Sequence, residues 1–172
     1  IKKNYLLSLE GGFEGIQDNY NKNRKRISKR LFDNLDIDKN GDIEVFIANY
    51  KNQDKPYTIS DEAVDRLKCL CLKGMQQVHV WNVFQGKEFL AGLVWLEDAQ
   101  RITYLAPLAD EKAKQLHVPT YLINELIKDF QGQQMILDFE GSMVAGVENF
   151  YQSFGAHAES YYYVKKRFLH DV

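Results

Sequence analysis

The sequence contains little cysteine and no long apolar run. Its two cysteines, Cys69 and Cys71, are two positions apart in an expected helix, where their side chains point to different sides and do not favour a disulfide. Sparse cysteine is typical of a reducing compartment, so we expect a cytoplasmic protein whose cysteines pack in the core. No apolar stretch reaches the roughly 18 residues of a membrane-spanning helix, and no signal-peptide pattern is visible.

The sequence also lacks the motifs of several enzyme classes. It has no G-x-x-x-x-G-K-[ST] phosphate loop and no G-x-S-x-G nucleophile elbow. Its four histidines are scattered without metal-ligand spacing, and we expect no metal site and no tightly bound cofactor. Residues 36–43 match the start of a calcium-binding EF-hand loop, but the twelfth position is Ile47 instead of glutamate. A tight turn followed by a helix cap explains the same residues, and we favour this interpretation.

Charge is nearly balanced overall but uneven along the chain. The formal net charge is −2, which gives no overall field that would attract nucleic acid or an anionic membrane. The first 30 residues, however, carry eight basic side chains against three acidic ones. Many of them lie on an expected helix that is capped by Asp18 or Asn19 and contains Arg24 and Arg26. This basic face is either an ordinary solvated surface or a surface on which Arg24 and Arg26 bind substrate phosphates or a partner.

Length and composition favour a single packed domain. The chain has 172 residues, of which 45% are apolar and 13% aromatic, enough for a proper core. Three consecutive strand-like runs joined by short turns predict an antiparallel meander. Because both strand faces are largely apolar, we expect an α/β layered fold in which helices cover both faces of a mixed, mostly antiparallel central sheet. The expected strands cover residues 5–9, 77–84, 88–96, 101–106, 135–139 and 158–168, and the expected helices cover residues 20–35, 43–50, 60–74, 119–130 and 147–154.

Residues 134–156 form the most informative stretch of the chain. A short apolar run within it is long enough for a buried strand and is followed by polar and flexible residues. Open α/β sheets usually bind ligands at the carboxyl ends of their strands, which is where Asp138, Glu140 and Ser142 fall. A helix then runs to Gly155, which ends it. The pattern fits a functional site on a scaffold, and it fits an ordinary strand–turn–helix unit equally well.

Two stretches of the sequence resemble a known family. The sequence DFEG-S followed by GVENFYxxFG, residues 138–155, resembles the last strand and helix of the FemAB-like branch of the GNAT acyltransferase superfamily. Residues 21–30 are similar to the basic N-x-R-R-x-I-K-K helix that precedes the transferase domain in that branch. The resemblance implies one GNAT-like domain over residues 1–172. Because the sequence begins at Ile1 and the branch often carries tandem domains, we expect the C-terminal part of a longer chain, with an upstream GNAT domain missing.

The resemblance also implies where an acyl donor lies. In the GNAT fold two neighbouring strands diverge, and acyl-CoA occupies the wedge between them. In this chain those strands correspond to residues 101–106 and residues 135–139. Thr103 and Leu105 on the first strand are therefore expected to contact the donor.

The phosphates of the donor are expected at the start of the following helix. The superfamily pattern there is Q/R-x-x-G-x-G/A, whose backbone N–H groups hold the pyrophosphate. This chain matches the pattern at Gln115, but Val118 and Thr120 stand at its two glycine positions, and Pro119 between them has no N–H. The departure fits the FemAB-like branch, where aminoacyl-tRNA serves as a donor, while acyl-CoA is the other candidate co-substrate.

Acyl transfer to an amine needs a base, a group that stabilises the oxyanion, and an acid for the leaving group. Glu140 is our candidate base and Asp138 the alternative, although either carboxylate could instead cap the turn. Tyr151 belongs to a Tyr-x-x-x-Gly pattern that is similar to the one whose tyrosine is the acid in GNAT enzymes. It could equally be a partly buried helix tyrosine. Ser142 either hydrogen-bonds a substrate or caps the helix.

These observations support two hypotheses. The first is an acyltransferase that moves an acyl or aminoacyl group from a CoA or tRNA donor to an amine of a small molecule or peptide. The second is a non-catalytic GNAT-fold half that binds a substrate or a partner domain. The DFEG-S residues favour the first, and the lost glycines favour the second. A tyrosine run with basic neighbours either binds nucleic acid or forms an ordinary last strand; it comprises Tyr161, Tyr162, Tyr163, Lys165, Lys166 and Arg167.

Overall fold

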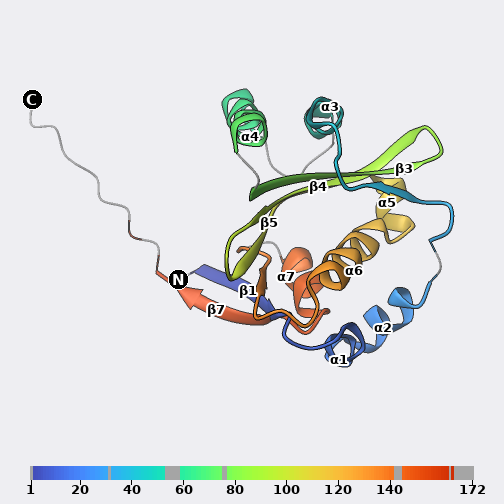
Figure 1. Ribbon diagram of the computed structural model, residues 1–172, viewed down its shortest axis with the longest axis vertical. Coiled ribbons are helices and arrows are strands. Elements are labelled where there is room, and N and C mark those ends of the chain that lie inside the picture. Colours follow the sequence, from blue (N-terminus) through green and yellow to red (C-terminus); the bar gives the residue numbers. More distant parts are fainter. Residues whose placement is uncertain are drawn as a thin grey trace, which may run out of the picture.

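One seven-stranded sheet runs through the computed structural model, which describes residues 2–30, 32–52, 59–74, 77–141, 145–162 and 164 (Figure 1). All neighbouring strands are antiparallel except β5 and β6, which are parallel. The expected mixed, mostly antiparallel sheet is therefore confirmed. In spatial order the strands are β2 (Asp36–Asp38), β3 (Val78–Gln85), β4 (Glu88–Glu97), β5 (Arg101–Ala109), β6 (Ile136–Asp138), β1 (Lys2–Ser8) and β7 (His157–Tyr161).

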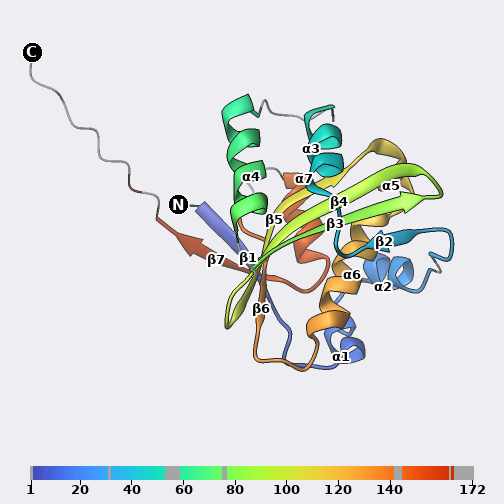
Figure 2. The same cartoon turned by 45° about the horizontal axis from the view of Figure 1, so that its top comes forward.

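Helices cover both faces of this sheet, as expected (Figures 1 and 2). Two helices, α3 (Ile43–Asn52) and α4 (Asp61–Lys73), lie on the face of β3, β4 and β5 and enclose the smaller of two apolar clusters. The larger cluster lies on the opposite face and includes Trp81, Leu93 and Ile123. The helices on that side are α1 (Phe13–Gln17), α2 (Lys22–Ser28), α5 (Glu111–Gln115), α6 (Val118–Phe130) and α7 (Ala145–Gln152).

A β-bulge reverses the alternation of side chains along β5. Residues two apart on either side of the bulge therefore pack in different apolar clusters. Val94 pairs with Ala106 and Trp95 with Tyr104, which leaves Leu105 as the extra residue of β5. Before the bulge, Tyr104 belongs to the larger cluster, and after it Ala106 belongs to the smaller one. The predicted range of β4 is correct to within one residue, whereas β5 runs to Ala109, three residues beyond its predicted end.

The predicted helix over residues 20–35, with its cap at Asp18 or Asn19, is wrong at both ends, because α2 covers only Lys22–Ser28. The structure has two short helices instead, because Asp18 ends α1 and the side chain of Asn21 caps α2 by accepting the N–H of Arg24 at 2.8 Å. The expected helix over residues 60–74 is confirmed as α4, and Ser60 is its N-cap: the Ser60 hydroxyl accepts the N–H of Ala63 at 3.2 Å.

The two cysteines differ in their surroundings. Cys69 is exposed, so its predicted place in the core is wrong, whereas Cys71 is half-buried on α4. Burial raises the pKa of the Cys71 thiol to about 11, so the thiol stays protonated at neutral pH. No helix in the described ranges is long and apolar enough to cross a membrane.

Strand β1 comes from the start of the chain but lies inside the sheet, between β6 and β7 (Figure 2). Its pairing extends beyond β6: the N–H of Phe139 donates to the carbonyl of Tyr5 at 2.9 Å, and the N–H of Tyr5 donates to the carbonyl of Glu140 at 3.2 Å. The chain that leaves β6 is therefore held against β1. The predicted last strand is shorter than expected and ends at Tyr161, while Tyr163, Lys165, Lys166 and Arg167 lie outside the described residues.

Candidate active site

Strands β5 and β6 diverge at the place where the donor wedge was expected. Their Cα pairing covers three residue pairs and ends with Thr103 opposite Asp138. Beyond this pair β5 continues to Ala109, whereas the chain after β6 follows β1. The parallel pair thus opens on the carboxyl side of β6, the side on which α/β sheets usually place ligands (Figure 2).

Three aromatic rings pack together beside the diverging strands. Tyr104 is the first β5 residue after the last pair, and its ring centroid is 5.6 Å from that of Phe139. Tyr151 of α7 stacks on Phe139 at 4.6 Å and meets Tyr104 edge-on at 6.2 Å. All three side chains are buried, and burial followed by the proximity of Tyr151 raises the pKa of Tyr104 well above its usual value. Tyr151, the predicted acid, therefore lies next to the wedge but within an apolar cluster.

Asp138 is buried and uses both carboxylate oxygens within the fold. Its side chain is 5% exposed. Oδ2 lies 2.6 Å from Nη1 of Arg101 at the start of β5, and Oδ1 accepts the backbone N–H of Glu140 at 2.7 Å. The ion pair joins β5 and β6 just before they separate. These contacts give Asp138 a structural task and make it the weaker candidate for a base.

Glu140 has a left-handed backbone conformation, with a φ of 57°. This conformation costs a non-glycine residue about 1–2 kcal/mol, so the hydrogen bonds from Tyr5 and to Asp138 are needed to hold it. The side chain is exposed, yet protein atoms desolvate its carboxyl enough to raise the pKa, and the nearby charge of Asp138 raises it further. A reachable carboxylate with a raised pKa has the properties that a general base requires.

The residues predicted to hold phosphates lie at the start of α6, but their backbone N–H groups are not arranged to bind a phosphate. His117, with a φ of 62°, is the N-cap residue and makes no side-chain cap bond. Val118 is fully buried, Pro119 has no N–H, and the N–H of Thr120 donates to the carbonyl of His117 at 3.0 Å. Gln115 is exposed at the end of α5.

Arg24 supplies a buried positive charge at this helix start. Its Nε donates to Oγ of Ser153 at 2.9 Å, and its Nη1 donates to the hydroxyl of Thr120. The guanidinium also lies over the rings of Phe150 and Phe154, at 4.5 and 4.6 Å. In the part of the chain that the structure describes, it forms no ion pair with a carboxylate. Burial lowers the pKa of Arg24 to about 10, so it remains charged at neutral pH.

Further basic groups surround the same helix start. Arg26 is exposed on α2 and donates to the side chain of Asn23 at 3.0 Å. Burial lowers the pKa of His117, and the charges of Arg30, Arg24 and Arg26 lower it further, which keeps its imidazole neutral near pH 7. The three arginines and the positive end of the α6 dipole together favour an anion here.

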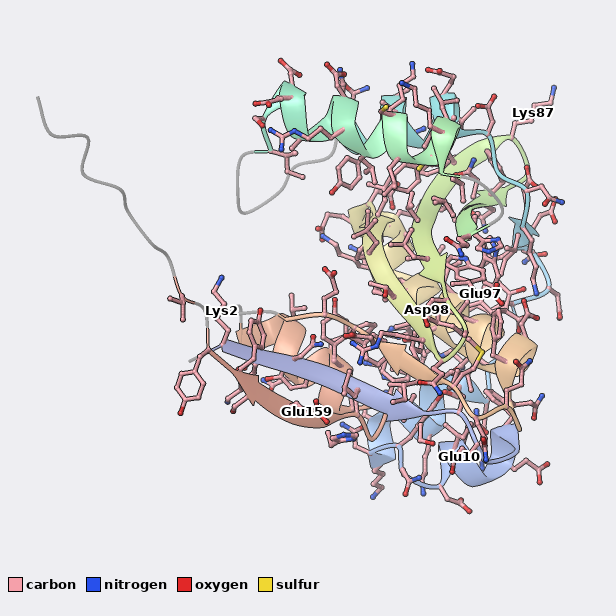
Figure 3. The ribbon with its side chains drawn as sticks, turned by 60° about the vertical axis from the view of Figure 1, so that its left-hand side comes forward. Lys2, Glu10, Lys87, Glu97, Asp98 and Glu159 are labelled. Atoms are coloured by element: carbon pink, nitrogen blue, oxygen red, sulfur yellow. The ribbon has the colours of Figure 1, made fainter. Side chains whose placement is uncertain are left out.

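The other predicted donor contacts lie on the opposite face of β5. Thr103 lines a pocket of about 280 Å³ together with Leu70 and Val78. Glu97 at the end of β4 and Asp98 in the β4–β5 turn also line it (Figure 3). The bulge residue Leu105 packs on the smaller apolar cluster under α3 and α4. Ser142 lies outside the described residues. Among the described residues, no group of three or more His, Cys, Asp or Glu could hold a metal ion.

Sequence reasoning missed three residues that shape the site. Glu148, in the first turn of α7, accepts the phenol of Tyr5 at 2.5 Å and lies 3.8 Å from Lys3. This hydrogen bond, followed by burial, raises the pKa of Tyr5 to about 12. Arg101 is the third missed residue. Glu148 lies within the GVENFY sequence that resembles the family, so the sequence could have indicated it. Tyr5 and Arg101 can be assigned to the site only once the strand pairing is known.

Comparison with known proteins assigns the family. The family model described as "Acetyltransferase (GNAT) domain" matches residues 20–150, most of the chain. The chain belongs to the GNAT acetyltransferase family. A comparison with curated proteins finds no match.

Solved structures resemble this GNAT domain at low sequence identity, which supports the shared fold. FemX superposes with a TM-score of 0.72 and 9% identity, over 92% of this chain and 60% of FemX. A possible acetyltransferase from Clostridium difficile 630 gives 0.58 and 12%, over 79% of this chain and 99% of that one. AAC(6')-Iy, solved with the bisubstrate analogue CoA-S-monomethyl-acetylneamine, gives 0.56 and 11%, over 78% and 99%.

The description of this family names acetyl transfer as its chemistry. The GNAT domain described here spans 60% of the length of FemX.

Proposed function

We propose that this GNAT domain is an N-acyltransferase of the FemAB-like branch that transfers an acyl or aminoacyl group from a CoA or tRNA donor to an amine. The observation that carries the proposal is the divergence of β5 and β6 at Thr103 and Asp138, with the exposed carboxylate of Glu140 just beyond it. The FemAB-like branch is supported by the superposition on FemX, which covers more of this chain than the two smaller acetyltransferases do.

The residues divide the reaction between them. Glu140 removes a proton from the attacking amine, whose nitrogen then forms a bond to the donor carbonyl carbon. The bond between that carbon and the donor sulfur or oxygen breaks, and the leaving group takes a proton, for which Tyr151 is the candidate donor. The raised pKa of Glu140 strengthens it as a base towards an ammonium group.

The arginines around α6 suit a donor that carries phosphates. A GNAT loop rich in glycine would offer backbone N–H groups, whereas this chain offers the charges of Arg24, Arg26 and Arg30. Phosphates are common to CoA and to tRNA, so this feature supports either donor. Acyl-CoA would be a co-substrate that leaves with each turnover, with Arg24 and Arg26 near its phosphates.

The alternative is a non-catalytic half that binds a substrate or partner domain. The specific observation in its favour is Pro119, which removes a donor from the start of α6 where the family pattern has flexible glycines flanking this position. FemX is longer than this chain, which covers 60% of it, and we propose that a further GNAT domain precedes this one.

Replacement of the candidate base tests the enzyme proposal. Glu140→Gln keeps the size of the side chain but removes its ability to take a proton, so we expect transfer to fall about 10²–10⁴-fold. The melting temperature should change little, because the backbone of Glu140, and not its carboxyl, makes the turn's hydrogen bonds. Steady-state assays would use acetyl-CoA and bulk charged tRNA as donors with a panel of amines.

The matched control is Glu10→Gln, an exposed glutamate in the turn after β1 (Figure 3), which should retain full activity. Undiminished transfer in Glu140→Gln would remove Glu140 as the base. A wild-type chain that binds a donor without turnover would favour the non-catalytic alternative.

A further inference from the structure

Three polar groups form a line across the point where β5 and β6 separate. The guanidinium of Arg101 on β5 contacts Oδ2 of Asp138 on β6 at 2.6 Å, and Oδ1 of the same carboxylate accepts the N–H of Glu140 at 2.7 Å. Asp138 is 4% exposed, while the side chain of Arg101 is 44% exposed. One buried carboxylate thus links the first residue of β5 to the turn that carries the candidate base.

We propose that Arg101 is a positioning residue for the transfer reaction, acting through Asp138 to hold the turn at Glu140 and to offset the negative charge beside the Glu140 carboxyl. The inference rests on the proposed function, because it takes Glu140 as the base. Arg101 itself is not assigned a contact with substrate.

The backbone of the turn explains why such support is needed. A left-handed glutamate is strained by about 1–2 kcal/mol and persists only when its surroundings fix it. The next residue, Gly141, approaches β1 so closely that a Cβ there would lie 2.5 Å from the carbonyl oxygen of Lys3. Hydrogen bonds to Tyr5 and Asp138 hold the turn from two sides, and the ion pair fixes the position of Asp138.

Arg101 also counteracts the main charge acting on Glu140. Asp138 is the charged group that raises the pKa of Glu140, after the effect of desolvation. Other ionisable groups lie on the neighbouring elements: Lys3 on β1 and Glu148 on α7 are 3.8 Å apart and offset each other, and a Cβ at Gly141 would lie 3.4 Å from the Tyr161 hydroxyl on β7. In the part of the chain that the structure describes, Arg101 is the cation paired directly with Asp138. Its removal would leave the Asp138 charge uncompensated.

The activity–pH profile distinguishes this role from a structural one. Transfer rises with pH as Glu140 loses its proton, so the midpoint of the rising limb follows the pKa of Glu140. Arg101→Gln leaves Asp138 uncompensated, favours protonated Glu140, and should move the limb to higher pH. Asp138→Asn keeps an oxygen that accepts the Glu140 N–H but removes the charge, and should move the limb to lower pH. Arg101→Lys keeps the charge and should restore the wild-type limb.

The matched control is Arg66→Gln, which breaks an exposed ion pair with Glu62 on α4 and should leave the limb in place. A purely structural ion pair would lower the melting temperature in both Arg101→Gln and Asp138→Asn without moving the limb in opposite directions. Equal limbs in all variants, or shifts of the same sign, would overturn the proposal. If Asp138→Asn fails to fold, the contrast between Arg101→Gln and Arg101→Lys decides.

A second readout separates this inference from the proposed function. The carboxyl carbon of Glu140 can be titrated by ¹³C NMR in the wild type, Arg101→Gln and Asp138→Asn, without any assay of transfer. Midpoints that move up in the first variant and down in the second would support the link even if Glu140 proved not to be the base. If the midpoints move in this way but Glu140→Gln retains transfer, the proposed function is contradicted and the link from Arg101 to Glu140 still holds.

Discussion

At the residue scale, the conformation of Glu140 argues for a function of its side chain. Glycine or asparagine would adopt its left-handed backbone at lower cost, yet the chain places a glutamate there and holds it with bonds to Asp138 and Tyr5. Strained residues that their surroundings over-determine are concentrated at functional sites. This physical argument supports Glu140 above Asp138, whose oxygens are occupied.

Part of this site follows from the sequence and part does not. The order strand, carboxylates, glycine, helix predicts Glu140, because these residues are adjacent in the chain. Arg101 and Tyr5 contact the site only through strand pairing, since they lie 37 residues before Asp138 and 143 residues before Glu148. The burial of Arg24 could not be predicted either. Its hydrogen-bond partners, Thr120 and Ser153, are distant in the sequence and come close only in the folded chain.

The hydrogen bond of the Tyr5 phenol leads to a prediction at the residue scale. Tyr5→Phe keeps the buried ring but removes the hydrogen bond to Glu148, so we expect a lower melting temperature at neutral pH. In the folded protein this bond, with burial, raises the pKa of Tyr5 from 10.0 to about 12. A raised phenol pKa stabilises the fold below pH 10, and this contribution is lost as the pH rises through the folded value, because the unfolded tyrosine ionises first.

Thermal melting of wild type and Tyr5→Phe as a function of pH measures this loss. The difference between their melting temperatures should shrink between pH 10 and pH 12. Other buried tyrosines, such as Tyr104, affect both proteins equally and cancel in the difference. If the difference in melting temperature stays constant between pH 10 and pH 12, the hydrogen bond to Glu148 does not raise the pKa of Tyr5, and the prediction is wrong.

At the element scale, periodicity predicted the long elements but missed β2, α5 and the division between α1 and α2. The meander and α6 were found because their apolar patterns are long and regular. The break between α1 and α2 was missed because Asn21, and not Asp18 or Asn19, makes the capping bond. The place of β1 inside the sheet was beyond any local pattern, since backbone hydrogen bonds between β1 and β6 leave no periodicity in either strand.

The end of α7 gives a prediction at this scale. Gly155 has a φ of 80°, and a Cβ there would lie 2.6 Å from Cβ of Asn19 and 2.9 Å from its carbonyl oxygen. Gly155→Ala should therefore lower the free energy of unfolding by roughly 2 kcal/mol, through backbone strain and displacement of the α1–α2 connection. Chemical denaturation measures the change.

The matched control for this substitution is Gly146→Ala within α7. Among the described residues, a Cβ at Gly146 would have no neighbour within 4 Å, and alanine is the better helix former. Stability should therefore stay equal or rise by up to about 1 kcal/mol. Similar destabilisation by both substitutions would contradict the explanation based on the left-handed conformation.

At the scale of the whole molecule, charge is segregated in a way that the net value conceals. The overall charge is −2, yet Arg24, Arg26 and Arg30 gather around the start of α6. Ring contacts connect this region to the Glu140 turn. Arg24 lies over the ring of Phe154, and Phe154 contacts Phe139, the residue before Glu140. A donor with phosphates at α6 and its acyl group in the wedge would span these two places.

The last prediction follows from this arrangement and concerns which donor binds. A ligand of the native state raises stability by RT ln(1 + [L]/Kd), about 2.7 kcal/mol at a 100-fold excess over Kd. We expect acetyl-CoA, CoA or bulk charged tRNA to raise the melting temperature, and Arg26→Gln to reduce that rise while Arg66→Gln on α4 does not.

Salt separates the two donors in this experiment. A shift with tRNA that fades between low and physiological salt would point to the α2 arginines and an aminoacyl donor, because displaced counterions make such binding steeply salt-dependent. A shift with acetyl-CoA and CoA would mean that the wedge accepts a pantetheine donor despite Pro119. No shift with any of the three would count against a donor site in this domain and favour the non-catalytic half, because stabilisation of the native state requires only binding and no turnover.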